Sequence, residues 1–267
     1  MKNKIRELLQ ILLIVIAAIL PWVVDFSGIV SKAIKDGVDV GLKEYAIITS
    51  GRYILSIVLA VIALQLVRNR NKEYVFNDTG NEYCDHEYWW FCVCSKILGY
   101  KKCSLVRVPI SMQFKLLIEK TFQEYSYGNE MNYTRIDDEN IVILTENGRK
   151  DIVNLVLVDT YPVPPELLPG VVGHNTTVFI KRENTDGKQY ISQNFCGEVQ
   201  KTVYKLVQAG CSTINVFPTT NAAHNITIVQ SAFMKGGRGD VEHLYVFPQP
   251  NFSKHDWRFS DKGVKLR

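Results

Sequence analysis

The sequence lacks the short motifs by which many enzyme classes are recognised. It contains no P-loop, no G-x-S-x-G nucleophile elbow, no H-E-x-x-H zinc motif and no G-x-G-x-x-G dinucleotide fingerprint. Its five histidines are scattered along the chain, where each is more simply a surface or core residue than a catalyst. We therefore expect a protein that is not an enzyme.

The spacing of metal ligands and an excess of basic charge are also lacking. Cys84, His86, Cys92, Cys94 and Cys103 lie near one another, but they include no C-x2-C pair and only one histidine. A buried helix or strand is the simpler interpretation, and we predict no metal site and no resident cofactor. The net charge of +4 is too small and too dispersed to indicate duplex DNA binding.

What the sequence does contain is two long apolar stretches near the N-terminus, at residues 8–24 and 46–67. The first just meets the length needed to cross a hydrocarbon core of about 30 Å, and the second can cross it with some tilt. A signal peptide is the alternative for the first stretch, but Pro21 and Trp22 stand where a small-residue cleavage site would be. The sequence therefore predicts a transmembrane hairpin over residues 1–70.

Basic residues predict the orientation of this hairpin. They precede the first span and follow the second, whereas the loop between the spans carries both signs of charge. Both termini are thus expected in the cytoplasm, with the protein a multi-pass component of the cell inner membrane. The six cysteines all follow the second span and should be thiols in a reducing cytosol. An inverted topology would instead permit disulfides and glycans.

Three polar side chains inside the predicted spans are candidates for a role in the membrane. Gln10 and Gln65 can form hydrogen bonds between helices, and Arg52 could line an opened path. The alternative is that Arg52 snorkels to the interface and that the glutamines have only local roles.

Residues 71–267 predict a single cytosolic α/β domain of Rossmann-like type, because short β-branched runs alternate with segments of helical periodicity. The expected strands are 104–110, 140–145, 151–160, 178–181, 212–218 and 241–247. The expected helices are 111–125, 189–209 and 219–234, the last capped by Thr219 or Thr220. Residues 161–175 are rich in proline and should form a structured loop.

One ligand site has a physical rationale in this domain. Ligands of open α/β sheets bind beyond the carboxyl ends of strands, close to helix N-termini. Pro218, Thr219, Thr220 and Asn221 stand at such a place and offer hydroxyl, amide and backbone N–H groups that suit a nucleotide phosphate. Plain helix capping is the alternative.

The segment from Ile214 to Phe247, with a strand INVFP, a helix TTNAAHNITIVQSAFMKGG and a strand VEHLYVF, resembles the closing βαβ unit of CARF/SAVED-type sensor domains. With the hairpin, the whole chain resembles bacterial two-transmembrane antiphage effectors found beside retrons or in CBASS-type operons. The resemblance implies an abortive-infection effector whose cytosolic sensor, once triggered, leads the spans to disrupt the membrane. It implies three partners: a cyclic nucleotide from a neighbouring synthase, a retron reverse transcriptase with its non-coding RNA, or further copies of the chain.

Two other functions remain open at this stage. The first is a membrane-tethered enzyme, such as a nuclease or an NAD-cleaving effector, which would need acids or a nucleophile converging in one pocket. Asp137, Asp138 and Glu139 are the one acidic cluster, and a polar turn accounts for them. The second is a scaffold that anchors a partner complex at the membrane.

Overall fold

The computed structural model describes residues 2–24, 42–78, 83–128, 133–136, 140–183, 188–234, 241–249 and 257–267. Most of the loop between the predicted spans and the acidic run at 137–139 lie outside the described residues. The chain forms two compact units. The first comprises Met1–Thr79 and Trp89–Cys103, and the second comprises Gly80–Tyr88 and Ser104–Arg267.

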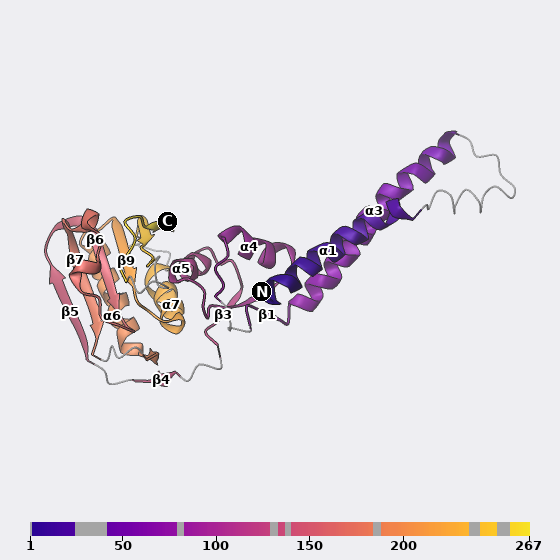
Figure 1. Ribbon diagram of the computed structural model, residues 1–267. Coiled ribbons are helices and arrows are strands. Elements are labelled where there is room, and N and C mark those ends of the chain that lie inside the picture. The colour runs from indigo at the N-terminus through magenta and orange to yellow at the C-terminus, as the bar shows by residue number, and fades with distance from the viewer. Residues whose placement is uncertain are drawn as a thin grey trace. The chain divides into compact units, whose positions relative to one another are not determined.

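The hairpin of the first unit consists of α1 (Lys2–Val23) and α3 (Leu42–Asn71), which lie side by side (Figure 1). Both helices are long and apolar enough to cross a membrane, as the sequence predicts. Large side chains such as Leu9 and Ile54 are about 60% exposed, at 58% and 61%, which suits a lipid environment rather than water. Helix α3 runs on to Asn71, four residues beyond the end of the predicted span at 67.

The rest of the first unit is a small aromatic cluster. It contains α4 (Tyr88–Cys92), the π-helix η1 (Val93–Ile97) and a parallel pairing of β1 (Val75–Phe76) with β2 (Lys102–Ser104). The buried rings of Phe76, Phe91 and Tyr100 pack edge to face with centroids 5.6 Å apart. Packing thus groups this cysteine-rich segment with the hairpin, whereas the predicted division at residue 70 separates the two.

A six-stranded sheet forms the centre of the second unit, with the strand order β11-β10-β9-β6-β7-β5 (Figure 1). The four central strands are parallel, and the two edge strands, β11 and β5, run antiparallel to their neighbours. The α/β class is therefore confirmed. The strand bounds are β5 Ile141–Glu146, β6 Arg149–Val158, β7 Asn175–Arg182, β9 Thr213–Pro218, β10 His243–Val246 and β11 Val264–Lys265. Shorter strands are β3 Glu124–Ser126, β4 Thr134–Arg135 and β8 Tyr190–Ile191, of which β4 and β8 pair in parallel.

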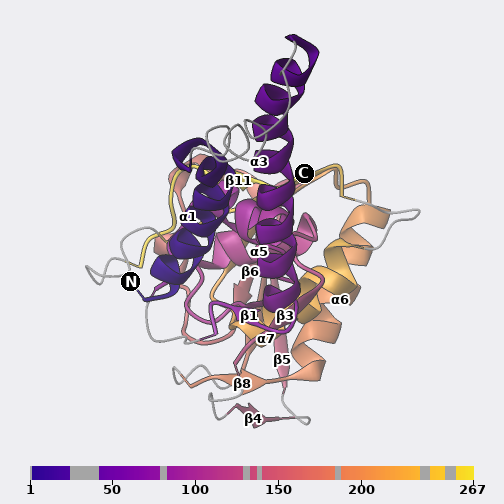
Figure 2. The ribbon, with the colours of Figure 1, turned by 90° about the vertical axis from the view of Figure 1, so that its right-hand side faces the viewer.

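The connections cover the two faces of this sheet differently. From β6 to β7 the chain moves toward the β5 edge of the sheet. From β7 through α6 (Gln193–Gln208) to β9, and from β9 through α7 (Ala222–Ile228) to β10, it moves toward the β11 edge. Since such crossovers are right-handed, the first connection must lie on the face opposite to the two helices. Helices α5 (Ile110–Ile118), α6 and α7 accordingly lie together (Figure 2).

The opposite face carries a separate apolar cluster without a long helix in the described residues. The β6–β7 connection, with the short turns η2 (Pro165–Leu167) and η3 (Gly170–Val172), packs Val163 and Val172 against Val156, Phe217 and Phe247. The ring centroids of Phe217 and Phe247 are 4.5 Å apart in a stacked arrangement. The expected structured loop is thus present and packs on the sheet as part of the core.

Three local predictions were wrong. The helix expected over 111–125 ends at Ile118, and the last residues of that range lie in β3. Residues 105–109 form a turn and not a strand, because Arg107 has a left-handed backbone with φ of 56° and Pro109 ends the turn at the start of α5. The cap of α7 is Asn221, not Thr219 or Thr220. The segment does continue as a helix, through the π-helix η4 (Val229–Phe233), so its β-branched residues do not make a strand.

Candidate functional site

The carboxyl ends of β6 and β9 form a topological switch point. These strands are neighbours, yet the chain leaves β6 toward one face of the sheet and leaves β9 toward the other. Such a divergence opens a crevice beyond the strand ends in α/β proteins, and polar residues there are well placed to meet a ligand. Asp159 follows β6 at this point, and Thr219 follows β9.

The structure places the predicted residues Pro218, Thr219, Thr220 and Asn221 at this switch point. Pro218 closes β9, and the next three residues are only 1%, 3% and 5% exposed. The Thr219 hydroxyl donates to Leu157 O at 3.1 Å and accepts from Asp159 N at 3.1 Å, so it joins the two strand ends. Asn221 Oδ1 accepts from His224 N at 2.9 Å, which caps α7.

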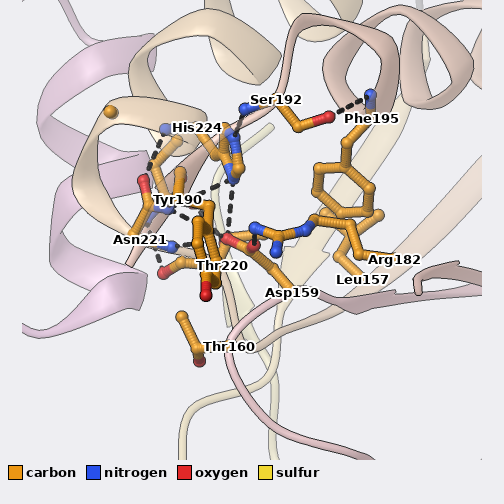
Figure 3. A network of polar contacts seen from close by, with 12 residues as sticks. Leu157, Asp159, Thr160, Arg182, Tyr190, Ser192, Phe195, Thr220, Asn221 and His224 are labelled. Atoms are coloured by element: carbon orange, nitrogen blue, oxygen red, sulfur yellow. Dashed lines mark hydrogen bonds and ion pairs between the residues drawn. The ribbon is translucent and has the colours of Figure 1, made fainter. Parts of the chain in front are cut away.

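A fully buried carboxylate, Asp159, lies at the centre of the site (Figure 3). One oxygen accepts from Arg182 Nη1 at 2.8 Å. The other accepts from Asn221 N at 3.1 Å, Asn221 Nδ2 at 3.2 Å and His224 Nδ1 at 2.7 Å. Because Arg182 is also 0% exposed, the two charges compensate each other away from water.

The hydrogen bonds of His224 define its tautomer. Its Nε2 accepts from the backbone N–H of Ser192 at 2.8 Å, so Nε2 carries no proton. Nδ1 must then carry the proton that it donates to Asp159. The 3.3 Å approach of Asn221 Nδ2 to Nδ1 joins two donors, and we assign it no hydrogen bond. The imidazole therefore links α7 to the start of α6, where Ser192 is the helix cap.

The outer border of the network is formed by half-buried side chains. Thr160 Oγ1 donates to Thr219 O at 2.6 Å, and the ring of Tyr190 lies 4.8 Å from the Arg182 guanidinium. Burial raises the pKa of Tyr161 to about 12, so its hydroxyl stays protonated, and it donates to Gln249 Oε1.

The arrangement offers little for acid–base or nucleophilic chemistry. Both ring nitrogens of His224 are engaged in hydrogen bonds. Burial raises the pKa of the nearby Cys196 thiol to about 12, which keeps it from forming a thiolate at neutral pH. Within the described residues, no three His, Cys, Asp or Glu side chains converge as a metal site requires.

The three candidate residues of the membrane spans do not form one site. Gln10 pairs with Asn71, the last residue of α3, through reciprocal hydrogen bonds of 2.9 Å. Gln65 is exposed, whereas Arg52 is half-buried and lies about 20 Å from Gln65 along the helix axis. Their proposed roles in the membrane stay predictions.

Sequence reasoning missed Asp159, Arg182 and His224. The signal that could have found the first is local, since Asp159 and Thr160 directly follow an apolar strand that is expected to be central in the sheet. No local pattern identifies the other two, because they reach the site from β7 and α7.

The chain combines two apolar membrane helices with an open, mainly parallel sheet that has a buried polar switch point. These features define a membrane-associated two-helix protein with an α/β domain. Residues 1–260 match the model of the SMODS- and ubiquitin system-associated 2TM effector domain (SUa-2TM), and the chain belongs to this family. It is therefore an antiphage defence effector of the two-transmembrane kind.

Solved structures also show similarity to this chain. Two are of the Acinetobacter baumannii Cap4 SAVED/CARF-domain-containing receptor, with the cyclic trinucleotides 2'3'3'-cAAA and 3'3'3'-cAAA. Both have a TM-score of 0.45, with 7% and 8% sequence identity over 66% and 88% of this chain. The chain spans 40% and 61% of the length of those two proteins. No curated protein matches the chain in sequence.

Proposed function

We propose that the protein is a multi-pass effector of the bacterial inner membrane, with both termini in the cytoplasm. A trigger acting on the α/β domain leads the hairpins to assemble and disrupt the membrane, so that the infected cell dies. The action requires no enzymatic step by this chain.

The observation that supports this proposal is the hairpin itself. Most of its large apolar side chains face outward, and the two helices pack against each other at their far end through Trp22 and Tyr53, whose ring centroids are 4.9 Å apart. A pair of packed helices encloses no lumen, so permeation needs several copies whose polar residues face inward. Arg52 is the charge within the second span that can line such an opening.

The proposed trigger is a cyclic nucleotide, the class of ligand in the two Cap4 structures. Its support in this chain is the switch point. Half-buried Thr160, Tyr161 and Tyr190 border it, and the buried hydrogen bonds of Asp159 fix its inner side. Release of a retron complex or binding of a host protein are the other triggers. Mass spectrometry of small molecules retained by the purified protein tests the first of these directly.

The membrane step is tested in cells that carry the gene with its native neighbours and are challenged with phage. A voltage-sensitive dye should report depolarisation before lysis in the wild type. Arg52→Leu should reduce the response, whereas Arg52→Lys, which keeps the charge, should retain it. Protection from phage without any depolarisation would refute the proposal and favour a scaffold or an enzyme. Point variants are preferable to deletion of the hairpin, because residues 89–103 pack against its base.

A further inference from the structure

The cytoplasmic base of the hairpin contains a cluster of polar side chains that the proposed function does not use. We call Glu7, Gln10, Asn71 and Tyr100 the basal clasp. Glu7 is 0% exposed, Asn71 1% and Tyr100 2%, although all three are polar. Such burial is costly unless the groups serve as partners for one another.

The hydrogen bonds of the basal clasp join three segments of the first unit. The side-chain amides of Gln10 in α1 and Asn71 in α3 bond each other in both directions at 2.9 Å. Asn71 Nδ2 also donates to Leu98 O at 2.9 Å, and the Tyr100 hydroxyl donates to Glu7 Oε1 at 3.1 Å. The two membrane helices are thus held together by the segment Leu98–Tyr100.

One member of the clasp is incompletely satisfied. Glu7 Oε1 accepts from Tyr100 and from Arg6 Nε at 3.3 Å, but Glu7 Oε2 is buried and accepts no hydrogen bond from the described residues. Burial beside Glu7 raises the pKa of the Tyr100 hydroxyl, which therefore remains a donor. A buried carboxyl with an unused oxygen makes the closed arrangement specific without making it very stable.

The same stretch of chain is held a few residues later by the second unit. Gln113 Nε2 in α5 donates to Leu105 O at 3.2 Å and to Val108 O at 2.7 Å. Gln113 Oε1 accepts from Asn225 Nδ2 in α7 at 2.8 Å. The Asn225 side chain is hydrogen-bonded to Thr220, the neighbour of Asn221 at the switch point.

We propose that the basal clasp holds the hairpin in its resting arrangement. A change at the switch point then releases the clasp through the segment Leu98–Val108. This inference rests on the proposed function, because it describes how the membrane step is restrained. Residues 101–104 connect the two held ends, and a chain spans at most about 3.5 Å per residue. Lys102 and Cys103 in this connection pair with β1, so a displacement that starts at Gln113 acts on an ordered segment that leads to Tyr100.

The resting restraint is tested by breaking the clasp without any trigger. Gln10→Leu removes both amide hydrogen bonds, and Tyr100→Phe removes one hydroxyl while keeping the ring. Each should raise the fraction of depolarised cells about tenfold over the wild type at matched protein levels in the membrane fraction. Asn69→Leu, at an exposed amide of α3, and Tyr74→Phe, at an exposed tyrosine, are the matched controls and should behave as the wild type.

A reciprocal exchange separates loss of the clasp from misfolding. Gln10→Asn combined with Asn71→Gln restores two facing amides, and it should return the resting signal toward the wild-type level. The inference would be overturned if the clasp variants showed no more depolarisation at rest than the wild type, whether or not they respond to phage. Failure of the wild type itself to depolarise would instead refute the proposed function.

Transmission is tested with Gln113→Glu, which keeps an acceptor for Asn225 but removes the N–H donor to Leu105 and Val108. This variant should remain silent at rest. Its phage-triggered depolarisation should be at least about tenfold smaller than that of the wild type. Adding Tyr100→Phe should restore depolarisation without a trigger, because the clasp lies downstream. A normal triggered response of Gln113→Glu, or no effect of the added substitution, would show that the signal takes another route.

Discussion

Replacing Asp159 by asparagine should be among the most destabilising single changes in the α/β domain. Asparagine has nearly the same volume but no charge, and it can accept at only one of the two oxygen positions. The substitution leaves the Arg182 guanidinium, which is 0% exposed, without its counter-charge. It also leaves donors from Asn221 and His224 competing for a single acceptor.

The expected loss follows from this geometry. Breaking a buried ion pair by removing one partner costs about 3–5 kcal/mol, because the remaining charge stays buried and unpaired. For a domain of this size, 1 kcal/mol corresponds to about 2–4 °C in Tm, so the shift should be of the order of 10 °C. Thermal unfolding of the detergent-solubilised protein, followed by circular dichroism, measures it.

Asp151 provides the matched control for this experiment. It lies on β6, the strand that Asp159 follows, and its partner Arg149 is 2.9 Å away, but the two side chains are 53% and 62% exposed. An exposed pair contributes little, so Asp151→Asn should move Tm by less than about 2 °C. Equal shifts for Asp151→Asn and Asp159→Asn would refute the argument that burial makes the Asp159 network critical.

Three further predictions follow from burial and close packing. Burial raises the pKa of Cys196 and of Tyr161 to about 12 in the folded protein, so the folded state keeps protons that the unfolded chain releases above about pH 9 and 10. Stability should therefore fall as the pH rises from 9 to 12, and a Tm that is constant over this range would contradict it. In native protein, maleimide should label the half-buried Cys92 faster than the fully buried Cys94, and mass spectrometry of peptides after timed labelling tests the order. Gly148→Ala should lower Tm by several degrees, because its Cβ would lie 2.6 Å from the backbone of residues 174 and 175; an unchanged Tm would show that the turn adjusts freely.

Much of the α/β domain follows from local sequence patterns. Strands β5, β6, β7 and β9 and helices α6 and α7 lie within a few residues of where β-branched runs and helical periodicity predict them. The exception at residues 105–109 depends on a neighbouring residue outside that segment. The Gln113 side chain binds the carbonyls of Leu105 and Val108, so a sequence that looks like a strand is held as a turn.

The structure places Thr219 to Asn221 directly after β9, whereas a role for them in ligand binding stays a prediction. The position of Thr219 to Asn221 after an apolar strand is a local signal. Their burial is not, because it depends on Asp159 and Arg182, which arrive from two other strands. Residues that appear free to bind a phosphate are instead hydrogen-bonded within the protein.

By itself the sequence determined the two membrane helices, their order before an α/β domain, and the approximate place of a polar site. These properties depend on the length and periodicity of apolar runs, which are local and additive along the chain. Only the tertiary structure decided which polar groups meet. The contact between Gln10 and Asn71 spans 61 positions, and that between Glu7 and Tyr100 spans 93. A hydrogen bond requires two groups to lie within about 3 Å, and only the folded packing of distant segments sets such a distance.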